Sequence, residues 1–534
     1  MLIIALWLQL LLQCCFKVVN CGRILILPMH VEASHKKSMV PFAEALGSKG
    51  HDVTIWNSFY VKQPIKNAKH FTDYDVVVPT KHQMFRDMFV YKNSTGSLDV
   101  WTAPNIKPWG FMFPWIINLQ TCHETLAEAS NEIEQLSKQH WDLIIMDMFF
   151  APCAYVIIEK TLQQQHTTPY ALMSTSFFVN FMFSHYGIPF PIASAVAIEQ
   201  EFDILRFWDR VEYVFYWKLL DVGVTKAIEY LIKQYVSPPL SDPFTLSTFD
   251  EDASLIFSLY PSAFDPGRPL IRTAHQIGDV NCSSAFGNAK PLPDDLEAFV
   301  SDPTSKGTIV AAFGHMVRWD KAPTSTITAF QTAFAELKDY RFIWQYDGPP
   351  MSSLSSNVLV MKWLPQPDLL AHPKTVLFLS HMGLKSAIEG VCNRLPVAAL
   401  PIYAEQAYNT HQLVKLNNAG VSLNKFLLTK PYMVAKLRDV LENKHKYGQS
   451  MAKLAQFMAD KIISDVDLGV YWMEFTIRHR KQLHLIRDRS KCLNFIQYFM
   501  LDVIALVGFS ILTFAAVSIA ALWLILKSIR KLGS

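Results

Sequence analysis

Short apolar runs alternate with helix-length amphipathic segments through most of the chain. In the N-terminal half, strand-like runs are expected at 23–28, 51–56, 141–147 and 168–174, and a helical pattern covers 38–50. These runs are apolar at consecutive positions rather than at every second one, which is typical of parallel strands buried on both faces. Strands of this kind, alternating with helices, predict an open parallel sheet with helices on both sides.

The same alternation begins again after a Pro-bearing stretch of mixed polarity at 281–295. The pattern predicts an α/β fold of two doubly wound, Rossmann-like domains, 22–285 and 286–475, that face each other across a cleft. The second domain has expected strands at 307–314, 341–345, 357–363, 375–380 and 396–400 and expected helices at 324–337 and 385–392.

Both ends of the chain are strongly apolar. Residues 1–21 have the length of a secretory signal and predict one, although their start lacks positive charge; an uncleaved anchor or a buried helix is the alternative. Residues 503–526 carry no charge, and a helix of that length spans about 36 Å, enough to cross a hydrocarbon core of about 30 Å. Together the two segments predict a single-pass type I membrane protein, with 22–502 lumenal, 476–502 a juxtamembrane segment and 527–534 a basic cytosolic tail.

Charge and cysteine usage narrow the function classes. The net formal charge of +3 gives no electrostatic indication of nucleic-acid binding. Asn93 and Asn281 begin sequons that could be glycosylated in the lumen. Of eight cysteines, those outside the signal have no paired spacing for zinc, so no metal site is expected, and disulfides are left open. These cysteines are Cys122, Cys153, Cys282, Cys392 and Cys492.

Polar and aromatic side chains follow several expected strands of the C-terminal half. Trp363 ends one strand, His381 follows the next, and Glu405 with Gln406 follows the last. Ligands of open parallel sheets bind outside the carboxyl ends of the strands, so these side chains are candidates for ligand contact. The first strand is not followed by a G-x-G-x-x-G and the sequence has no Walker motif, which argues against a dinucleotide dehydrogenase or a P-loop enzyme.

Each of these side chains has a chemical role and a structural alternative. His381 precedes a helix N-terminus, which attracts phosphate oxygens, but it could equally cap or pack. Trp363 offers a flat face on which a base can stack, and the structural alternative is that it is a core side chain. Glu389, on the helix after His381, could accept bonds from two ribose hydroxyls or lie on a solvated helix face. Glu405 and Gln406 suit sugar hydroxyls if they contact a ligand at all.

The N-terminal half has its own pair of candidates. His35 is expected in the loop after the first strand, and Asp147 ends the strand at 141–147, so both lie at the carboxyl edge of the sheet. An Asp that holds one imidazole nitrogen leaves the other to take a proton from a hydroxyl. Each residue alone also fits a structural role, and the sequence leaves open whether the two side chains meet.

Longer stretches of the chain resemble a known family. "WLPQPDLLAHPKTVLFLSHMGLKSAIEGVCNRLPVAALPIYAEQAYNTHQ" at 363–412 is similar to the C-terminal signature of UDP-glycosyltransferases of the membrane-bound UDP-glucuronosyltransferase type. "SHKKSMVPFAEALGSKGHDVTI" and "MDMFFAPC" resemble the family's N-terminal catalytic stretches, and "RPLIRTAHQIGDV" resembles its interdomain segment. The resemblance covers nearly the whole chain and implies a GT-B fold with an acceptor-binding N-terminal domain and a UDP-sugar-binding C-terminal domain.

The resemblance also implies roles for single residues. His35 would be the general base and Asp147 its partner in a single inverting displacement. The UDP-sugar would be a co-substrate, with no cofactor and no metal, and the acceptor a small lipophilic molecule. Trp363 would stack on uracil, Gln366 would lie near the nucleoside, His381 would bind the diphosphate, Glu389 the ribose, and Glu405 with Gln406 the sugar. The remaining expected donor-site residues are Gly314, His315, Gly383, Lys385 and Ser386.

The chain departs from the family's pattern mainly at this donor site. Met382 stands where Gly is usual, Lys385 where Asn is usual, and Glu405 where Asp is usual. His315 replaces a Ser, and Arg394 replaces a Gly. These changes leave open whether the sugar is glucuronic acid or glucose.

Three hypotheses of different classes follow. The first is an active glycosyltransferase in the lumen of the endoplasmic reticulum. The second is a degenerate member that binds nucleotide sugar or a partner without turnover, and the third is a membrane-anchored binding or structural protein with this fold. An aromatic run at 203–217 suits a lipophilic acceptor or membrane contact equally well. The acceptor's identity and the oligomeric state stay open.

Overall fold

The computed structural model describes most of residues 21–532. The stretches outside the description are 1–20, 30–32, 66–67, 83–85, 87–99, 103–107, 149–150, 176–204, 213–218, 237–243, 266–269, 279–288, 315–316, 352, 404, 488–492 and 533–534.

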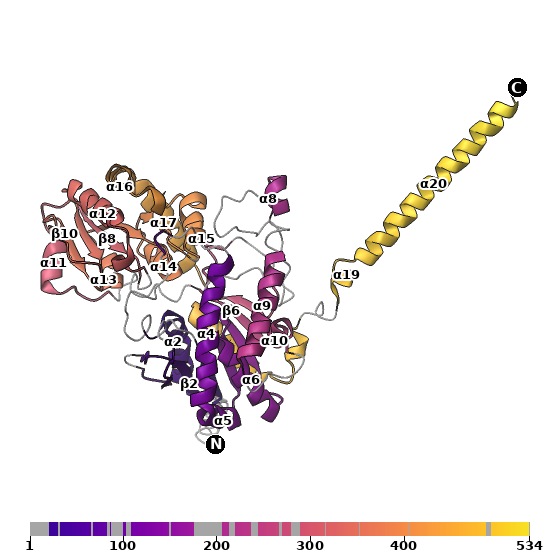
Figure 1. Ribbon diagram of the computed structural model, residues 1–534, viewed down its shortest axis with the longest axis horizontal. Coiled ribbons are helices and arrows are strands. Elements are labelled where there is room, and N and C mark those ends of the chain that lie inside the picture. Colours follow the sequence, from indigo (N-terminus) through magenta and orange to yellow (C-terminus); the bar gives the residue numbers. More distant parts are fainter. Residues whose placement is uncertain are drawn as a thin grey trace, which may run out of the picture. The chain divides into compact units, whose positions relative to one another are not determined.

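The first sheet, of which Figure 1 labels β2 and β6, is parallel and 7-stranded. Its strand order is β3-β2-β1-β4-β5-β6-β7. Side chains of its central strand β1 alternate between two apolar layers. Ile24 and Ile26 face a core that includes α2, whereas Leu25 and Leu27 face a core built with α4, α6 and α9. The strands are β1 (Arg23–Leu27), β2 (Asp52–Phe59), β3 (Thr72–Val77), β4 (Leu143–Asp147), β5 (Tyr170–Ser174), β6 (Leu255–Ser258) and β7 (Ala274–Gln276). The helices are α2 (Ala33–Ser48), α4 (Pro108–Glu128), α5 (Ser130–Lys138), α6 (Pro152–Gln164), α8 (Phe207–Glu212), α9 (Leu219–Tyr235) and α10 (Leu246–Asp252).

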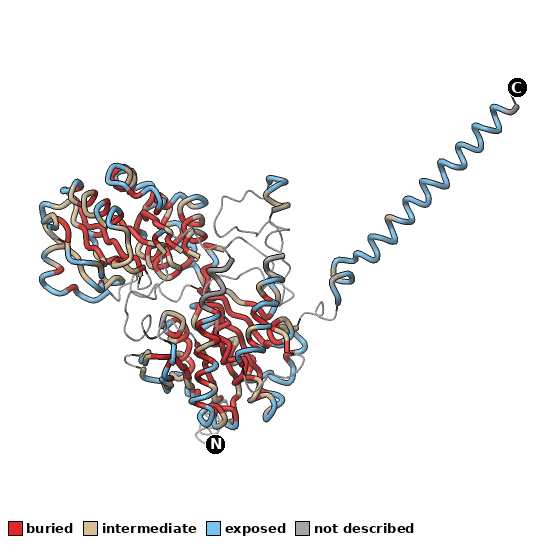
Figure 2. Tube along the Cα trace, in the orientation of Figure 1, coloured by how far each residue is buried: buried red, intermediate tan, exposed pale blue. Residues whose placement is uncertain are grey.

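The second sheet is parallel and 6-stranded, in the order β10-β9-β8-β11-β12-β13. Along β8, Ile309 and Ala311 face a core with α12 and α16, while Val310 and Ala312 face one with α14 and α17. Figure 2 shows most strands of both sheets as buried, whereas the edge strand β3 is partly exposed. The predicted α/β class is confirmed. The strands are β8 (Thr308–Ala312), β9 (Arg341–Gln345), β10 (Val358–Met361), β11 (Thr375–Ser380), β12 (Val397–Ala399) and β13 (Gly420–Ser422). The helices are α11 (Asp294–Val300), α12 (Thr324–Glu336), α13 (Gln366–Ala371), α14 (Leu384–Cys392), α15 (Gln406–Thr410), α16 (Lys430–Glu442) and α17 (Lys444–Ala459).

After the second sheet, α18 (Asp465–Arg478) lies against the first. Val470 and Met473 join the core that contains Ile24, and a Cβ on Gly469 would come within 2.7 Å of the Phe42 ring. Only a residue without a side chain allows α18 to approach α2 this closely.

The chain then continues into a separate compact unit, Ile486–Ser534, the other unit being Met1–Leu485. It contains α19 (Phe495–Tyr498) and α20 (Leu501–Leu532). Within α20, Leu501–Arg530 has a mean hydropathy of 2.4 and is long and apolar enough to cross a membrane. The span expected at 503–526 lies inside it.

The helix α2 begins earlier than the sequence predicts, and this changes the expected environment of His35. The helical pattern was expected from residue 38, but α2 begins at Ala33, so His35 lies in a helical first turn and not in a loop. The hydrophobic pattern does not show this turn, because its Lys36 is charged and yet buried. Its Nζ lies 2.6 Å from Asp73 Oδ1 and 2.7 Å from Asp75 Oδ1 of β3.

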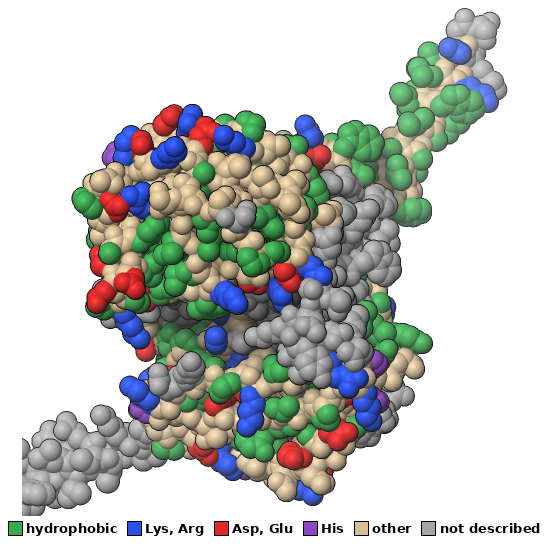
Figure 3. Space-filling view, turned by 60° about the vertical axis from the view of Figure 1, so that its left-hand side comes forward, with side chains coloured by type: hydrophobic (Ala, Val, Ile, Leu, Met, Phe, Trp, Pro, Cys, Tyr) green, Lys and Arg blue, Asp and Glu red, His purple; other side chains and the backbone are tan. Residues whose placement is uncertain are grey.

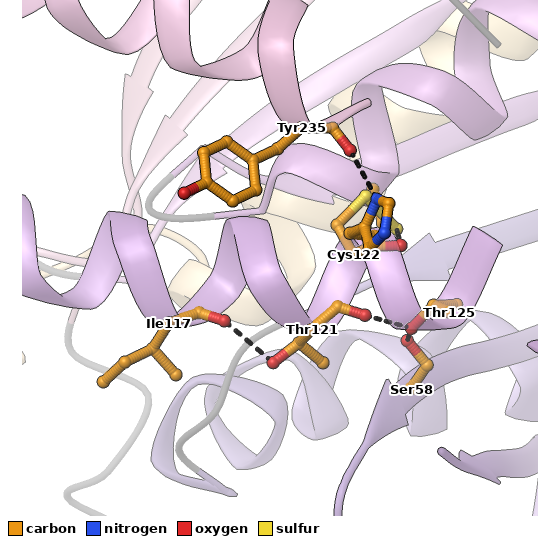
Figure 4. The surroundings of a disulfide bond; sticks show 8 residues. Ser58, Ile117, Thr121, Cys122, Thr125 and Tyr235 are labelled. Atoms are coloured by element: carbon orange, nitrogen blue, oxygen red, sulfur yellow. Dashed lines mark hydrogen bonds between the residues drawn. A yellow bond between two sulfur atoms is a disulfide. The ribbon is translucent and has the colours of Figure 1, made fainter. Parts of the chain in front are cut away.

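A disulfide joins Cys122 of α4 to Cys153 of α6 (Figure 4). On the same helix, Thr125 Oγ1 lies 2.8 Å from Ser58 Oγ of β2, so α4 is connected both to its neighbouring helix and to the sheet. Cys392, at the end of α14, is also disulfide-bonded.

The surface carries charges of both signs. On the face shown in Figure 3, Lys and Arg side chains are interspersed with Asp and Glu side chains, in keeping with the net formal charge of +3.

Candidate active site

His35 and Asp147 meet at the carboxyl edge of the first sheet. Strand β4 pairs with β1, which leads into α2, so the strand order brings the end of β4 beside the first turn of α2. His35 Nδ1 lies 2.6 Å from Asp147 Oδ2. The Asp147 side chain is fully buried, while the His35 side chain retains 17% of its exposure. A buried carboxylate that accepts from Nδ1 orients the ring so that Nε2 is the nitrogen that can exchange a proton.

A third side chain, which was not predicted from the sequence, completes this cluster. Thr175 follows β5, the next strand in the sheet, and its Oγ1 lies 2.5 Å from His35 Nδ1. The hydroxyl donates to Asp147 Oδ2 over 3.0 Å. Applying the strand-end rule to the run at 168–174 would have found this residue, since it lies at the same edge as Asp147.

At the carboxyl edge of the second sheet, glycines surround the imidazole of His381. This residue follows β11, and a Cβ on Gly314 or Gly383 would come within 3.0 Å or 2.8 Å of its Nε2. Gly314 also has φ +71°, a backbone conformation that favours glycine. The carbonyl of Gly314 accepts from Gln345 Nε2 over 3.0 Å, a contact that joins the ends of β8 and β9.

Between His381 and Gly383, the backbone of Met382 is in the left-handed region, with φ 60°. Its side chain is fully buried in the core of the second sheet. Asn409 Nδ2 donates to the Met382 carbonyl over 2.9 Å, and Asn409 Oδ1 accepts from Tyr260 over 3.0 Å. The departure from the family's glycine therefore keeps the glycine-like backbone, held by hydrogen bonds and side-chain burial.

The helix α14 carries three of the expected donor-site residues, Lys385, Ser386 and Glu389. Gln366, the first residue of α13, donates from Nε2 to Glu389 Oε2 and lies 3.5 Å from Ser386 Oγ. Burial raises the pKa of Glu389, while the hydrogen bond from Gln366 and the charge of Lys385 act in the opposite direction. The alternative of a solvated helix face is wrong for Glu389, which is half-buried and hydrogen-bonded.

Glu405 and Gln406 lie at the start of α15 and use their side chains differently. Glu405 Oε1 accepts from the backbone N–H of Leu384, in the first turn of α14, over 3.3 Å. Gln406 is buried, and its Oε1 accepts from the N–H groups of Ile402 and Tyr403 over 2.8 and 3.0 Å. The Gln406 side-chain oxygen thus holds the loop after β12, whereas the Glu405 carboxylate lies at the helix N-terminus.

Trp363 lies after β10 and is 68% exposed, so the alternative of a core side chain is wrong. His315 lies outside the described residues, and so do both expected glycosylation sites, Asn93 and Asn281. Among the residues that the structure describes, no group of three His, Cys, Asp or Glu side chains could hold a metal ion.

One contact connects the two clusters of candidate residues. Lys385, in the first turn of α14, donates from Nζ to the carbonyl of Ser34 over 2.6 Å. Ser34 immediately precedes His35 in α2. The sequence offers no local signal for this contact, because the two residues are 351 positions apart.

The sequence of this chain is similar to those of known UDP-sugar transferases. The model of the UDP-glucoronosyl and UDP-glucosyl transferase family matches residues 22–533. A UDP-glucuronosyltransferase of Pleuronectes platessa is 38% identical over 260 residues, which are 49% of this chain and 52% of that protein. UDP-glucuronosyltransferase 1A1 of Mus musculus is 27% identical over 526 residues, covering 94% of this chain and 91% of that protein.

Solved glycosyltransferases share the fold. Phytolacca americana UGT2, complexed with UDP-2fluoro-glucose and pterostilbene, matches with a TM-score of 0.56 and 17% identity, over 86% of this chain and 100% of that chain. The spinosyn forosaminyltransferase SpnP matches with a TM-score of 0.53 and 15% identity, over 86% and 99%. At such identities the likeness concerns the fold alone, and it confirms the expected GT-B architecture.

Proposed function

Because the chain belongs to the UDP-glucoronosyl and UDP-glucosyl transferase family, and is therefore a UDP-glycosyltransferase, we propose that it transfers glucuronic acid or glucose from a UDP-sugar to a hydroxyl of a small lipophilic acceptor. The observation that carries this proposal is the 2.6 Å contact between His35 Nδ1 and the buried Asp147 carboxylate at the carboxyl edge of the first sheet. That contact supplies a general base at the edge where ligands of such sheets bind.

The proposed reaction is a single inverting displacement. His35 Nε2 takes the proton of the acceptor hydroxyl as its oxygen forms a bond to the anomeric carbon of the sugar. The bond from that carbon to the diphosphate oxygen breaks with its electron pair, so UDP leaves. Asp147 stabilises the imidazolium that forms.

The donor is proposed to bind at the second sheet. Its diphosphate would lie near His381 and the N-terminus of α14, where Gly314 and Gly383 allow close backbone approach. The uracil would stack on the exposed Trp363, and the ribose hydroxyls would bind Glu389, with Gln366 beside them. Glu405 would face the sugar, and the buried Gln406 would hold the loop beside it. His315 and Ser386 complete the proposed site, whereas Lys385 is bonded to Ser34 of α2.

The proposed domain roles follow from this placement. Residues 22–285 would bind the acceptor and residues 286–475 the donor. The exposed Phe207 and Trp208 of α8 suit either a lipophilic acceptor or the membrane surface. We place the catalytic part in the lumen of the endoplasmic reticulum, held by α20, because the disulfide between Cys122 and Cys153 requires an oxidising compartment.

Release of UDP tests the proposal. Membranes carrying the full chain are given UDP-glucuronic acid or UDP-glucose with a panel of simple phenols, alongside His35→Ala and Asp147→Asn. We expect phenol-dependent UDP release, reduced about 10²–10⁴-fold in His35→Ala because general-base catalysis is lost. His445→Ala, which changes an exposed histidine of α17, is the control and should behave as wild type.

Other outcomes distinguish the alternatives. Binding of the UDP-sugar without UDP release in the presence of any phenol would favour a degenerate family member. Met382, Arg394 and His315, which depart from the family's pattern, motivate that alternative. Release that is unaffected by His35→Ala would contradict the assignment of the base. Lack of any donor binding would contradict the transferase proposal as a whole.

A further inference from the structure

The ammonium group of Lys385 lies in a position that its own helix disfavours. Lys385 is the second residue of α14, and a positive charge in the first turn opposes the helix dipole. The nearby Glu405 carboxylate is bonded to the N–H of Leu384. Within the helix the charge of Lys385 interacts favourably with Glu389, and outside it Nζ donates to the Ser34 carbonyl over 2.6 Å.

The receiving end of this bond is rigid. The Ser34 carbonyl also accepts from Ser38 Oγ over 2.9 Å, within the first two turns of α2. Two residues after Ser34, the buried Lys36 is bonded to Asp73 and Asp75 and donates to the Gln63 carbonyl over 2.9 Å. The first turn of α2, which carries His35, is therefore connected both to β3 and to Lys385.

The donating end is equally well held. Leu384, next to Lys385, is bonded to Glu405, and Glu389 further along α14 accepts from Gln366 of α13. The bond between Lys385 and Ser34 thus connects two fixed elements, one bearing the candidate base and one beginning at the candidate diphosphate site. Its length restricts the distance between them.

We propose that Lys385 is a positioning residue that holds the catalytic turn of α2 at its working distance from the donor-binding end of α14. This inference rests on the proposed transferase function and adds a role to it: the lysine acts through His35 and not through the donor. The Asn that is usual in the family at this position has too short a side chain to make the same contact. The bond to Ser34 therefore depends on the Lys that this chain has instead.

Three variants of the full membrane-bound chain test the role. Lys385→Met keeps the length of the side chain and removes the ammonium group that donates the hydrogen bond. Lys385→Arg keeps a cationic hydrogen-bond donor. Lys453→Met removes an exposed charge on α17 and is the matched control. Steady-state kinetics with varied donor and varied phenol are combined with thermal unfolding and amide hydrogen exchange of residues 34–38.

We expect Lys385→Met to lower kcat by about 10–100-fold, because misplacement of a reacting group by about 1 Å has an effect of that size. The KM for the phenol and the unfolding temperature should stay near wild type, and exchange at 34–38 should become faster. Lys385→Arg should retain kcat within several-fold, and Lys453→Met should change nothing.

Two results would overturn the proposal. A raised donor KM with unchanged kcat in Lys385→Met would make the lysine a donor contact, and unchanged exchange at 34–38 would mean that the bond does not hold α2. If the wild-type chain itself releases no UDP, the transferase function fails, but the exchange experiment still decides whether Lys385 fixes the turn.

Discussion

At the scale of single residues, two departures from the family's glycines have the same backbone but different surroundings. Met382 has φ 60° and Arg394 has φ 57°, in the left-handed region that costs an ordinary residue roughly 1–2 kcal/mol. Arg394 is exposed, so Arg394→Gly removes strain and little else. We expect it to raise the unfolding temperature slightly, by relief of up to about 1 kcal/mol after the entropy cost of glycine.

Met382→Gly should have the opposite effect, because the Met382 side chain is fully buried. Removing it costs roughly 2–5 kcal/mol, which exceeds the strain that is relieved. Thermal unfolding of the solubilised protein measures both variants in one experiment. Equal shifts in the same direction would contradict the roles assigned to burial and backbone strain.

Thr175 gives the second prediction at this scale. Thr175→Val keeps the shape of the side chain but removes the hydroxyl that donates to the buried Asp147 carboxylate. A hydrogen bond to a charged group is worth about 1.5–3 kcal/mol, so we expect a lower unfolding temperature together with slower UDP release. Thr175→Ser keeps the hydroxyl and should retain both properties. A Val variant with wild-type turnover would remove Thr175 from the catalytic cluster.

At the scale of elements, the sequence predicts the longer buried strands but not the polar edge strand β3 or the short strands β6, β7 and β13. The runs that became β1, β4, β8 and β11 are apolar at nearly every position, because helices cover both faces of each sheet. The edge strand β3 reads TDYDVV and was not predicted, since two of its carboxylates serve the buried Lys36 and not the solvent.

The features of the candidate site likewise fall into those that the sequence predicts and those that it does not. Residues at strand ends, such as Asp147 and His381, follow from the strand pattern alone because parallel strands bring their carboxyl ends to one edge. The bond between Lys385 and Ser34 could not be predicted, since it depends on the placement of two helices that belong to different sheets. The earlier start of α2 was missed for a related reason: the ion pairs that bury Lys36 are long-range.

The packing of α18 makes stability depend on pH. Trp472 of α18 stacks on His275 of β7 with ring centroids 4.2 Å apart, and burial lowers the pKa of His275 from 6.5 to about 4. In the unfolded chain the imidazole takes up its proton near pH 6.5, so the folded state loses stability as the pH falls from about 6.5 towards 4. At about 1.4 kcal/mol per pKa unit, the loss reaches at most about 3.5 kcal/mol.

We therefore expect the unfolding temperature of the wild-type chain, followed by tryptophan fluorescence, to fall between pH 7 and pH 5. His275→Phe keeps an aromatic ring against Trp472 but cannot titrate, and its unfolding temperature should fall less over the same range. An equal fall in both proteins would assign the acid sensitivity to other groups.

At the scale of the whole molecule, the disulfide and the apolar helix both bear on the topology that we propose, in which the chain folds on the lumenal side of the membrane. Closing the 31-residue separation between Cys122 and Cys153 stabilises the fold by about 3–4 kcal/mol in the chain-entropy model, an effect that a reducing cytosol would remove. In the proposed topology, α20 holds the chain at the membrane and the basic residues after its apolar part lie on the cytosolic side.

This topology predicts a protection pattern in sealed vesicles from the endoplasmic reticulum. A protease added outside should remove an epitope tag placed after Ser534 but leave residues 22–485 intact, and detergent should expose them. Cys122→Ser with Cys153→Ser should keep the protection pattern, because the predicted signal and α20, and not the disulfide, set the orientation, while the unfolding temperature falls. If the protease digests the folded part of the wild-type chain without detergent, the catalytic site faces the cytosol, and the disulfide would then have to form in a reducing compartment.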